Sequence, residues 1–262
     1  MASSNTKTKT ITSTNTNATG KPPQSSAVKA YLLLYNLTCL VSWSWVLFLC
    51  VHHFILSAPT ATISPTPLQI QLQTFYPHVS SALYFAQSLA LLEILHSLTG
   101  LVRAGLLSTL LQVVSRLFLV WGIVYQVPVA RTTPSFTTMV LAWALVEVPR
   151  YLFYCLNLMQ DSSIPYALTW LRYSLFIVLY PMGISSELLT SYYSLPYIAE
   201  HKVLSISMPN RLNLPFDYYW FVCLALLVYV PGAPFLYRHM LVQRKKILSG
   251  GSAEEKQKPK AE

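Results

Sequence analysis

Apolar residues gather in six long runs that alternate with polar or proline-containing segments. A run of roughly 20 apolar residues is long enough, as a helix, to cross the hydrocarbon core of a bilayer. The runs cover about 30–56, 80–101, 106–127, 136–158, 167–193 and 216–241. The pattern predicts an all-α membrane protein, a bundle of six transmembrane helices.

The composition favours one membrane domain with a short tail at each end. Of the 262 residues, 53% are hydrophobic and only 10% are charged, which is too little charge for the surface of a soluble domain. We expect a disordered tail at 1–29, which is rich in Ser, Thr, Asn and Lys, the membrane domain at 30–241, and a second tail at 242–262. The last five residues, KPKAE, resemble the dilysine retrieval signal of endoplasmic reticulum membrane proteins.

Much of the formal net charge of +9 flanks the first and last runs. The residues concerned are Lys7, Lys9, Lys21, Lys29, Arg238, Arg244, Lys245 and Lys246. Basic residues accumulate on the cytoplasmic side of membrane proteins, so we expect both termini in the cytosol, and an even number of spans allows this. A protein that binds nucleic acid would instead carry its basic residues on one folded face.

Several polar residues interrupt the apolar runs. Charged side chains inside a bilayer usually face other helices and have a partner. The residues are Glu93 and His96 in the second run, Gln112 and Arg116 in the third, and Glu147 and Arg150 in the fourth. The i,i+3 spacing of Glu147 and Arg150 favours an ion pair within one helix. Glu93 and Arg116 could pair between helices, as scaffold rather than as catalytic groups.

Metal and disulfide chemistry are not favoured by the sequence. Glu93 and His96 share a helix face, but a di-metal bundle needs a second Glu-x-x-His motif and further glutamates. The four cysteines all lie in apolar runs and have no C-x-x-C spacing. We therefore expect neither a metal centre nor a disulfide framework.

The fifth run contains the stretch RYSLFIVLYPMGISSEL, residues 172–188. Tyr180 and Glu187 are seven residues apart, so they share a helix face. Pro181 lacks an N–H and promotes a kink directly after Tyr180, and Gly183 lets another backbone or a substrate approach closely. Glu187 has no basic residue three or four positions away. Two interpretations stay open: an acid–base pair with Tyr180, or a structural glutamate bonded to another helix.

This stretch resembles the signature of the very-long-chain (3R)-3-hydroxyacyl-CoA dehydratases, a family once described as protein tyrosine phosphatase-like. The resemblance extends to QSLALLEILHSLTGLVR in the second run, LLQVVSRLFLVWGI in the third and VEVPRYLFY in the fourth. It covers about residues 30–245, except 57–77. One departure is Pro149, where a β-branched residue is more usual, and we expect it to kink the helix near Arg150.

The resemblance implies six membrane helices with both termini cytosolic, in the endoplasmic reticulum membrane. It implies dehydration of a 3-hydroxyacyl-CoA to the trans-2-enoyl-CoA, the third step of the fatty-acid elongation cycle, without a cofactor. The family's catalytic pair corresponds to Tyr180 and Glu187. Its other motif positions, which support the structure or the substrate, correspond to Glu93, Gln112, Arg116, Glu147, Arg150 and Gly183. The implied partners are membrane lipid, the condensing enzyme, the ketoacyl-CoA reductase and the enoyl-CoA reductase.

Elimination of water needs a base for the C2 proton and an acid for the oxygen at C3. We prefer Glu187 as the base and Tyr180 as the acid, and the reverse assignment stays open. A membrane bundle also offers an apolar slot for a long acyl chain, and Arg103 could meet the CoA phosphates. In the expected topology Glu187 lies in the lumenal half of its span, so a cytosolic thioester has to reach deep into the bundle.

Other functions fit the sequence less well. A tyrosine phosphatase needs a reactive cysteine in a phosphate-binding loop, and Cys155 lies within an apolar run that has no glycine-rich loop. A transporter would repeat a helix break in a second half, and the sequence has no internal repeat. A non-catalytic scaffold of the elongation complex is the remaining alternative, and it would tolerate loss of Tyr180.

Overall fold

The computed structural model describes residues 25–56, 67–102, 105–159, 164–209 and 213–256. These residues form helices and one isolated bridge between Ile206 and Phe216, with no β-strand among them. Six of the described helical stretches are long and apolar enough to cross a membrane. They are Ser26–Ile55, Leu68–Leu98, Leu106–Val124, Pro134–Leu158, Tyr166–His201 and Tyr218–Leu248. The predicted all-α architecture with six spans is confirmed.

Several of the spans are assembled from more than one helical segment. In chain order the elements are α1 (Ser26–Val51), the π-helix η1 (His52–Leu56), α2 (Pro67–Leu89), α3 (Leu91–Leu98), α4 (Leu106–Leu117), the π-helix η2 (Phe118–Val124), the 3₁₀-helix η3 (Pro128–Thr132), α5 (Pro134–Leu158), α6 (Tyr166–Ser174), α7 (Phe176–His201) and α8 (Tyr218–Lys256). Residues 1–24 of the expected first tail, the dilysine-like ending and Arg103 lie outside the described residues. Helix α8 continues beyond residue 241 into the segment expected as the second tail.

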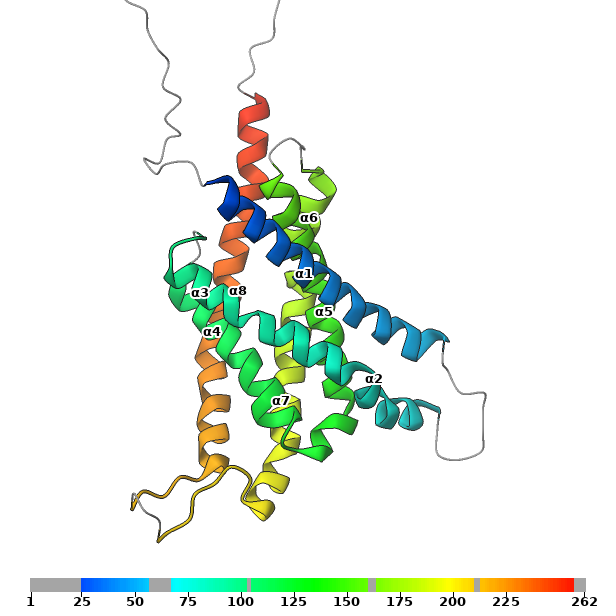
Figure 1. Ribbon diagram of the computed structural model, residues 1–262, viewed down its shortest axis with the longest axis vertical. Coiled ribbons are helices and arrows are strands. Elements are labelled where there is room, and N and C mark those ends of the chain that lie inside the picture. The colour runs from blue at the N-terminus through cyan, green and yellow to red at the C-terminus, as the bar shows by residue number, and fades with distance from the viewer. Residues whose placement is uncertain (1–24, 57–66, 103–104, 160–163, 210–212, 257–262) are drawn as a thin grey trace, which may run out of the picture.

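Helix α5 lies at the centre of the bundle, where α1 and α7 both pack against it (Figure 1). It is the most buried of the six spans, whereas α8 is the least buried and rests against α7 and α6. The start of α1 and the end of α8 lie toward the same end of the molecule (Figure 1). The central position of α5 means that its polar residues can reach several neighbouring helices.

Helix α5 begins with an N-cap residue followed by a proline. The side chain of Thr133 accepts a hydrogen bond from the backbone N–H of Phe136, and Pro134 occupies the first turn, where no N–H is needed. The helix then continues to Leu158 without interruption, although Pro149 lies inside it. The kink expected near Arg150 therefore does not break the helix.

Two spans are longer than their apolar runs predict. Helix α2 begins at Pro67 and continues through Pro77, a segment that the sequence suggested was a loop before residue 80. Phe75 and Val79 are fully buried, and burial of one helix face stabilises a helix beyond its apolar stretch. Helix α7 likewise extends to His201, well past the predicted end at residue 193.

The fifth span contains a boundary between α6 and α7 at Leu175. The kink directly after Tyr180 stays a prediction. Leu175 keeps right-handed helical angles (φ −57°, ψ −34°), and α7 continues unbroken through Pro181. Because Pro181 has no N–H, the Ile177 carbonyl loses its usual helical partner. The Tyr237 hydroxyl of α8 donates to that carbonyl at 3.5 Å. A neighbouring helix thus replaces the missing bond, as is common for proline in membrane helices.

Candidate active site

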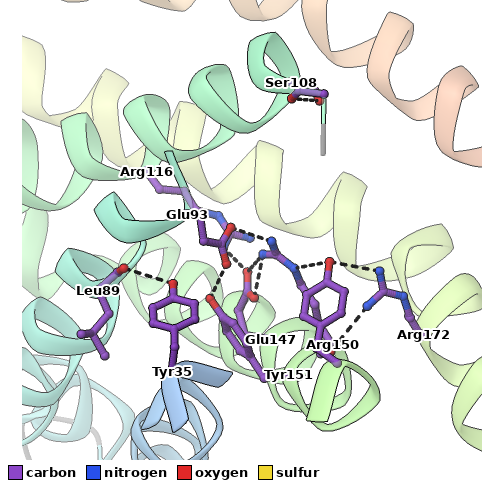
Figure 2. Close-up of polar contacts among 11 residues, drawn as sticks. Tyr35, Leu89, Glu93, Ser108, Arg116, Glu147, Arg150, Tyr151 and Arg172 are labelled. Atoms are coloured by element: carbon purple, nitrogen blue, oxygen red, sulfur yellow. Dashed lines mark hydrogen bonds and ion pairs between the residues drawn. The ribbon is translucent and has the colours of Figure 1, made fainter. Parts of the chain in front are cut away.

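A buried network of charged side chains joins α3, α4 and α5 (Figure 2). Glu147 on α5 is 1% exposed and accepts hydrogen bonds from Arg116 on α4 and from Arg150 on α5, the latter at 3.0 Å. Arg150 also donates to Glu93 on α3 at 2.7 Å, and Tyr151 donates to the other oxygen of Glu93 at 2.7 Å. Two acids thus balance two arginines, which is the condition for burying charge in an apolar bundle.

The network confirms one of the two pairings predicted from the sequence. Glu147 and Arg150 pair within α5 at i,i+3. The prediction that Glu93 pairs with Arg116 was wrong, because Glu93 pairs with Arg150 and Arg116 pairs with Glu147. The planar guanidinium of Arg150 presents several N–H groups at once, so it can bridge both carboxylates.

Arg172 on α6 extends the network to a fourth helix (Figure 2). Its guanidinium carbon lies 4.4 Å from the ring centroid of Tyr154 and 4.5 Å from that of Phe153. It donates to the Tyr154 hydroxyl at 3.2 Å and to the Arg150 carbonyl at 3.4 Å. Aromatic faces and neutral acceptors therefore stabilise this cation. Arg172 was not among the predicted site residues, and its only sequence signal was that it opens the fifth-run motif.

Three other predicted residues lie apart from this network. Gln112 is exposed on α4, and its side chain has no hydrogen-bond partner within the described part of the chain. His96 is buried and its Nε2 lies 2.8 Å from the Tyr31 hydroxyl. Gly183 is buried against α5, where an added Cβ would meet the Cβ of Ala142 at an ordinary 3.8 Å. A methyl group would therefore fit at Gly183, so the close approach that we predicted there does not require glycine.

Glu187 on α7 is buried and bonded to two other helices. Its Oε1 accepts a hydrogen bond from the indole N–H of Trp143 on α5 at 2.9 Å. Its Oε2 accepts one from the hydroxyl of Tyr229 on α8 at 3.0 Å. The guanidinium carbon of Arg116 also lies over the Trp143 ring, 5.2 Å from the ring centroid. One indole thus connects Glu187 to the charged network.

Tyr180 on α7 is partly buried and also faces α8. Its hydroxyl donates to the backbone carbonyl of Ala233 at 3.0 Å. Its ring stacks on Tyr237, with centroids 5.7 Å apart and planes 22° apart. The phenol is therefore held in one orientation, with its proton directed at a carbonyl oxygen.

The contacts with α8 bring Tyr180 and Glu187 into one region. Tyr180 bonds to Ala233 and Glu187 bonds to Tyr229. Ala233 and Tyr229 are four residues apart, which is about one turn, or about 6 Å along the helix axis. The shared face predicted from the seven-residue spacing is thus confirmed. A hydroxyl donor and a carboxylate thus contact adjacent turns of one neighbouring helix.

Comparison of the chain with known proteins identifies its family. The family model described as "Protein tyrosine phosphatase-like protein, PTPLA" matches residues 87–250, which include every residue of the charged network and both Tyr180 and Glu187. The chain belongs to this family. No solved structure matches it.

Curated members of the PTPLA family resemble the chain over most of its length. The Caenorhabditis elegans protein hpo-8 is 40% identical over 226 residues, 86% of this chain and 98% of the relative. Human dehydratase 2 is 39% identical over 220 residues, covering 84% and 81%, and Arabidopsis thaliana PASTICCINO 2 is 40% identical over 226 residues, covering 86% and 96%. All three are named very-long-chain (3R)-3-hydroxyacyl-CoA dehydratases.

Within this PTPLA chain, two residues beside Glu187 were missed by sequence reasoning. Trp143 lies one turn from Glu147 on α5, and Tyr229 lies two turns from Tyr237 on α8. Both could pass for ordinary apolar or interface aromatics in a membrane helix. Nothing in their own spacing points to Glu187, because the contact depends on how α5 and α8 pack against α7.

Proposed function

We propose that the protein is a very-long-chain (3R)-3-hydroxyacyl-CoA dehydratase, a hydro-lyase that converts its substrate to the trans-2-enoyl-CoA. Membership of the PTPLA family supports this, as does about 40% identity to dehydratases over most of both chains. Six apolar spans support a multi-pass membrane enzyme. The reaction is the third step of fatty-acid elongation.

The observation that carries the proposal is that Tyr180 and Glu187 both bond to α8, at positions about one turn apart. A hydroxyacyl thioester presents its C2 proton and its C3 oxygen on adjacent carbons, so it needs a base and an acid close together. Glu187 offers a carboxylate and Tyr180 offers an O–H. The carboxylates of Glu93 and Glu147, by contrast, form ion pairs with arginine.

The elimination proceeds in balanced steps. Glu187 takes the C2 proton, and the electrons of the C2–H bond form the C2=C3 double bond. The C3–O bond breaks, and Tyr180 gives its proton to the departing oxygen, which leaves as water. The proton on Glu187 then returns to the tyrosinate, which restores both groups. No electrons pass to or from the substrate, so two side chains suffice for the chemistry.

In this mechanism the substrate replaces a contact seen in the free protein. The Tyr180 hydroxyl donates to the Ala233 carbonyl at 3.0 Å, and the C3 oxygen of the substrate takes over as the acceptor. The stacked ring of Tyr237 keeps the phenol oriented during this exchange. Residues that hold catalytic groups in place reduce the entropy cost of reaching the transition state.

A row of polar side chains on α5 leads from its C-terminal end to Glu187. Trp143, Glu147, Arg150 and Tyr154 are spaced four, three and four residues apart, so they follow one helix face. Trp143 lies about 22 Å along the axis from the C-terminal end of α5, and it bonds to Glu187. We propose that the polar arm of the CoA thioester follows this face while the acyl chain occupies apolar surroundings.

We further propose a location in the endoplasmic reticulum membrane, with both termini in the cytosol. The basic flanks and the KPKAE ending support this orientation. The enzyme would then work in membrane lipid beside the condensing enzyme, the ketoacyl-CoA reductase and the enoyl-CoA reductase. Tagged termini probed with an impermeant reagent in sealed microsomes test the orientation, since lumenal tags would contradict it.

The activity is tested with the purified protein in detergent. Conversion of a very-long-chain (3R)-3-hydroxyacyl-CoA to the enoyl-CoA is followed by mass spectrometry for the wild type, Tyr180→Phe and Glu187→Gln. We expect activity in the wild type and its loss, by at least about a hundredfold, in both variants at unchanged thermal stability. A wild type inactive on every chain length would favour the non-catalytic scaffold instead.

A further inference from the structure

The carboxylate of Glu187 is held from two sides by side chains on different helices. Trp143 on α5 donates to Oε1 at 2.9 Å, and Tyr229 on α8 donates to Oε2 at 3.0 Å. An indole N–H can only donate a hydrogen bond. Each carboxylate oxygen has two lone pairs, so each keeps one free after accepting one bond. The group is therefore fixed in space and still able to accept a proton.

The two contacts solve a problem specific to a glutamate base. A glutamate side chain has several rotatable bonds and loses much rotamer freedom when it is fixed. A catalytic group needs to be held within about 0.5 Å of its productive position. A single hydrogen bond leaves the carboxylate free to rotate, whereas two donors on separate helices fix the positions of both oxygens.

We propose that Tyr229 and Trp143 are positioning residues that hold Glu187 in place to remove the C2 proton. The proposal rests on the proposed dehydratase function and adds two residues to its site. It also favours Glu187 as the base over the reverse assignment, since both of its oxygens act as acceptors. Tyr229 is the sharper test, because Trp143 also supports the guanidinium of Arg116.

Helix α8 provides a matched control for removing one hydroxyl group. The Tyr218 hydroxyl is buried and has no hydrogen-bond partner among the described residues. Tyr218→Phe and Tyr229→Phe therefore delete the same atom from the same helix. Only the second deletion removes a bond to Glu187.

The experiment measures kcat, KM and the primary deuterium isotope effect with substrate deuterated at C2, for Tyr229→Phe, Trp143→Phe and Tyr218→Phe. For Tyr229→Phe we expect kcat to fall roughly ten- to hundredfold, the range for one hydrogen bond to a charged group. KM should change little. The isotope effect should rise, because removal of the C2 proton becomes slower relative to the other steps. Tyr218→Phe should match the wild type.

The outcomes distinguish a failure of the positioning role from a failure of the proposed function. Unchanged kcat and isotope effect in Tyr229→Phe would overturn the positioning role, even with Glu187→Gln inactive. A loss in Tyr229→Phe beyond about a thousandfold would also overturn it, because a loss of that size indicates that Tyr229 transfers a proton itself. An active Glu187→Gln enzyme would instead overturn the proposed site. For Trp143→Phe, a raised isotope effect at wild-type KM supports the proposal independently of any change in melting temperature.

Discussion

Replacing Glu147 by glutamine removes the central carboxylate of the buried network while keeping the shape of the side chain. Glu147 is 1% exposed and accepts hydrogen bonds from both Arg116 and Arg150. After the substitution, Arg150 keeps Glu93 as its partner, whereas Arg116 loses the carboxylate that it contacts. The expected result is a large loss of stability caused by an uncompensated charge inside the bundle.

The magnitude follows from the burial of each partner. Removing one member of a buried ion pair costs about 3–5 kcal/mol of unfolding free energy. The side chains of Arg116 and Arg150 are 24% and 27% exposed, so their freed charges can be partly hydrated. We therefore expect Glu147→Gln to cost about 3 kcal/mol, at the lower end of the range.

A second substitution restores the charge balance. Adding Arg116→Met to Glu147→Gln leaves Arg150 paired with Glu93 alone. The double variant should be more stable than Glu147→Gln by about 1 kcal/mol or more, since contacting residues in one network show coupling energies of that order. This ordering is unusual, because most second substitutions destabilise a protein further.

The assay is equilibrium unfolding in mixed micelles with increasing denaturing detergent, followed by tryptophan fluorescence. The control is Asp217→Asn, which breaks an ion pair between Lys202 and Asp217 whose side chains are 68% and 37% exposed. This exposed pair should contribute less than about 1 kcal/mol. The single variant Arg116→Met is measured as well. If the double variant lost the sum of the losses of Glu147→Gln and Arg116→Met, the two groups would not be coupled and the account of the network would be refuted.

Two further substitutions test the packing of single glycines, each by its melting temperature in detergent. Gly122→Ala should destabilise the protein by about 1–3 kcal/mol, because a Cβ there would lie 2.5 Å from the Tyr218 hydroxyl. Adding Tyr218→Phe should recover part of this loss, and an absence of recovery would contradict the steric clash. Gly183→Ala should change stability by less than about 1 kcal/mol, because its Cβ would make an ordinary contact at 3.8 Å; a large fall in melting temperature would contradict this.

The sequence by itself determined the parts of this protein that depend on local chemistry. Six apolar runs determined the six spans, because a helix satisfies its backbone hydrogen bonds within one segment inside a bilayer. The i,i+3 spacing of Glu147 and Arg150 and the seven-residue spacing of Tyr180 and Glu187 followed from helix geometry alone. The motif resemblance then indicated the family, which the comparisons confirmed.

Only the tertiary structure decided which helices touch and which partners the polar groups choose. The early start of α2 at Pro67 depends on packing against neighbouring helices, since Phe75 and Val79 are buried there. The contacts of Glu187 with Trp143 and Tyr229 join α5, α7 and α8, which are far apart in the sequence. Periodicity fixes the face on which a side chain lies, but the partner facing it is set by the crossing of two helices, and no local pattern encodes that crossing.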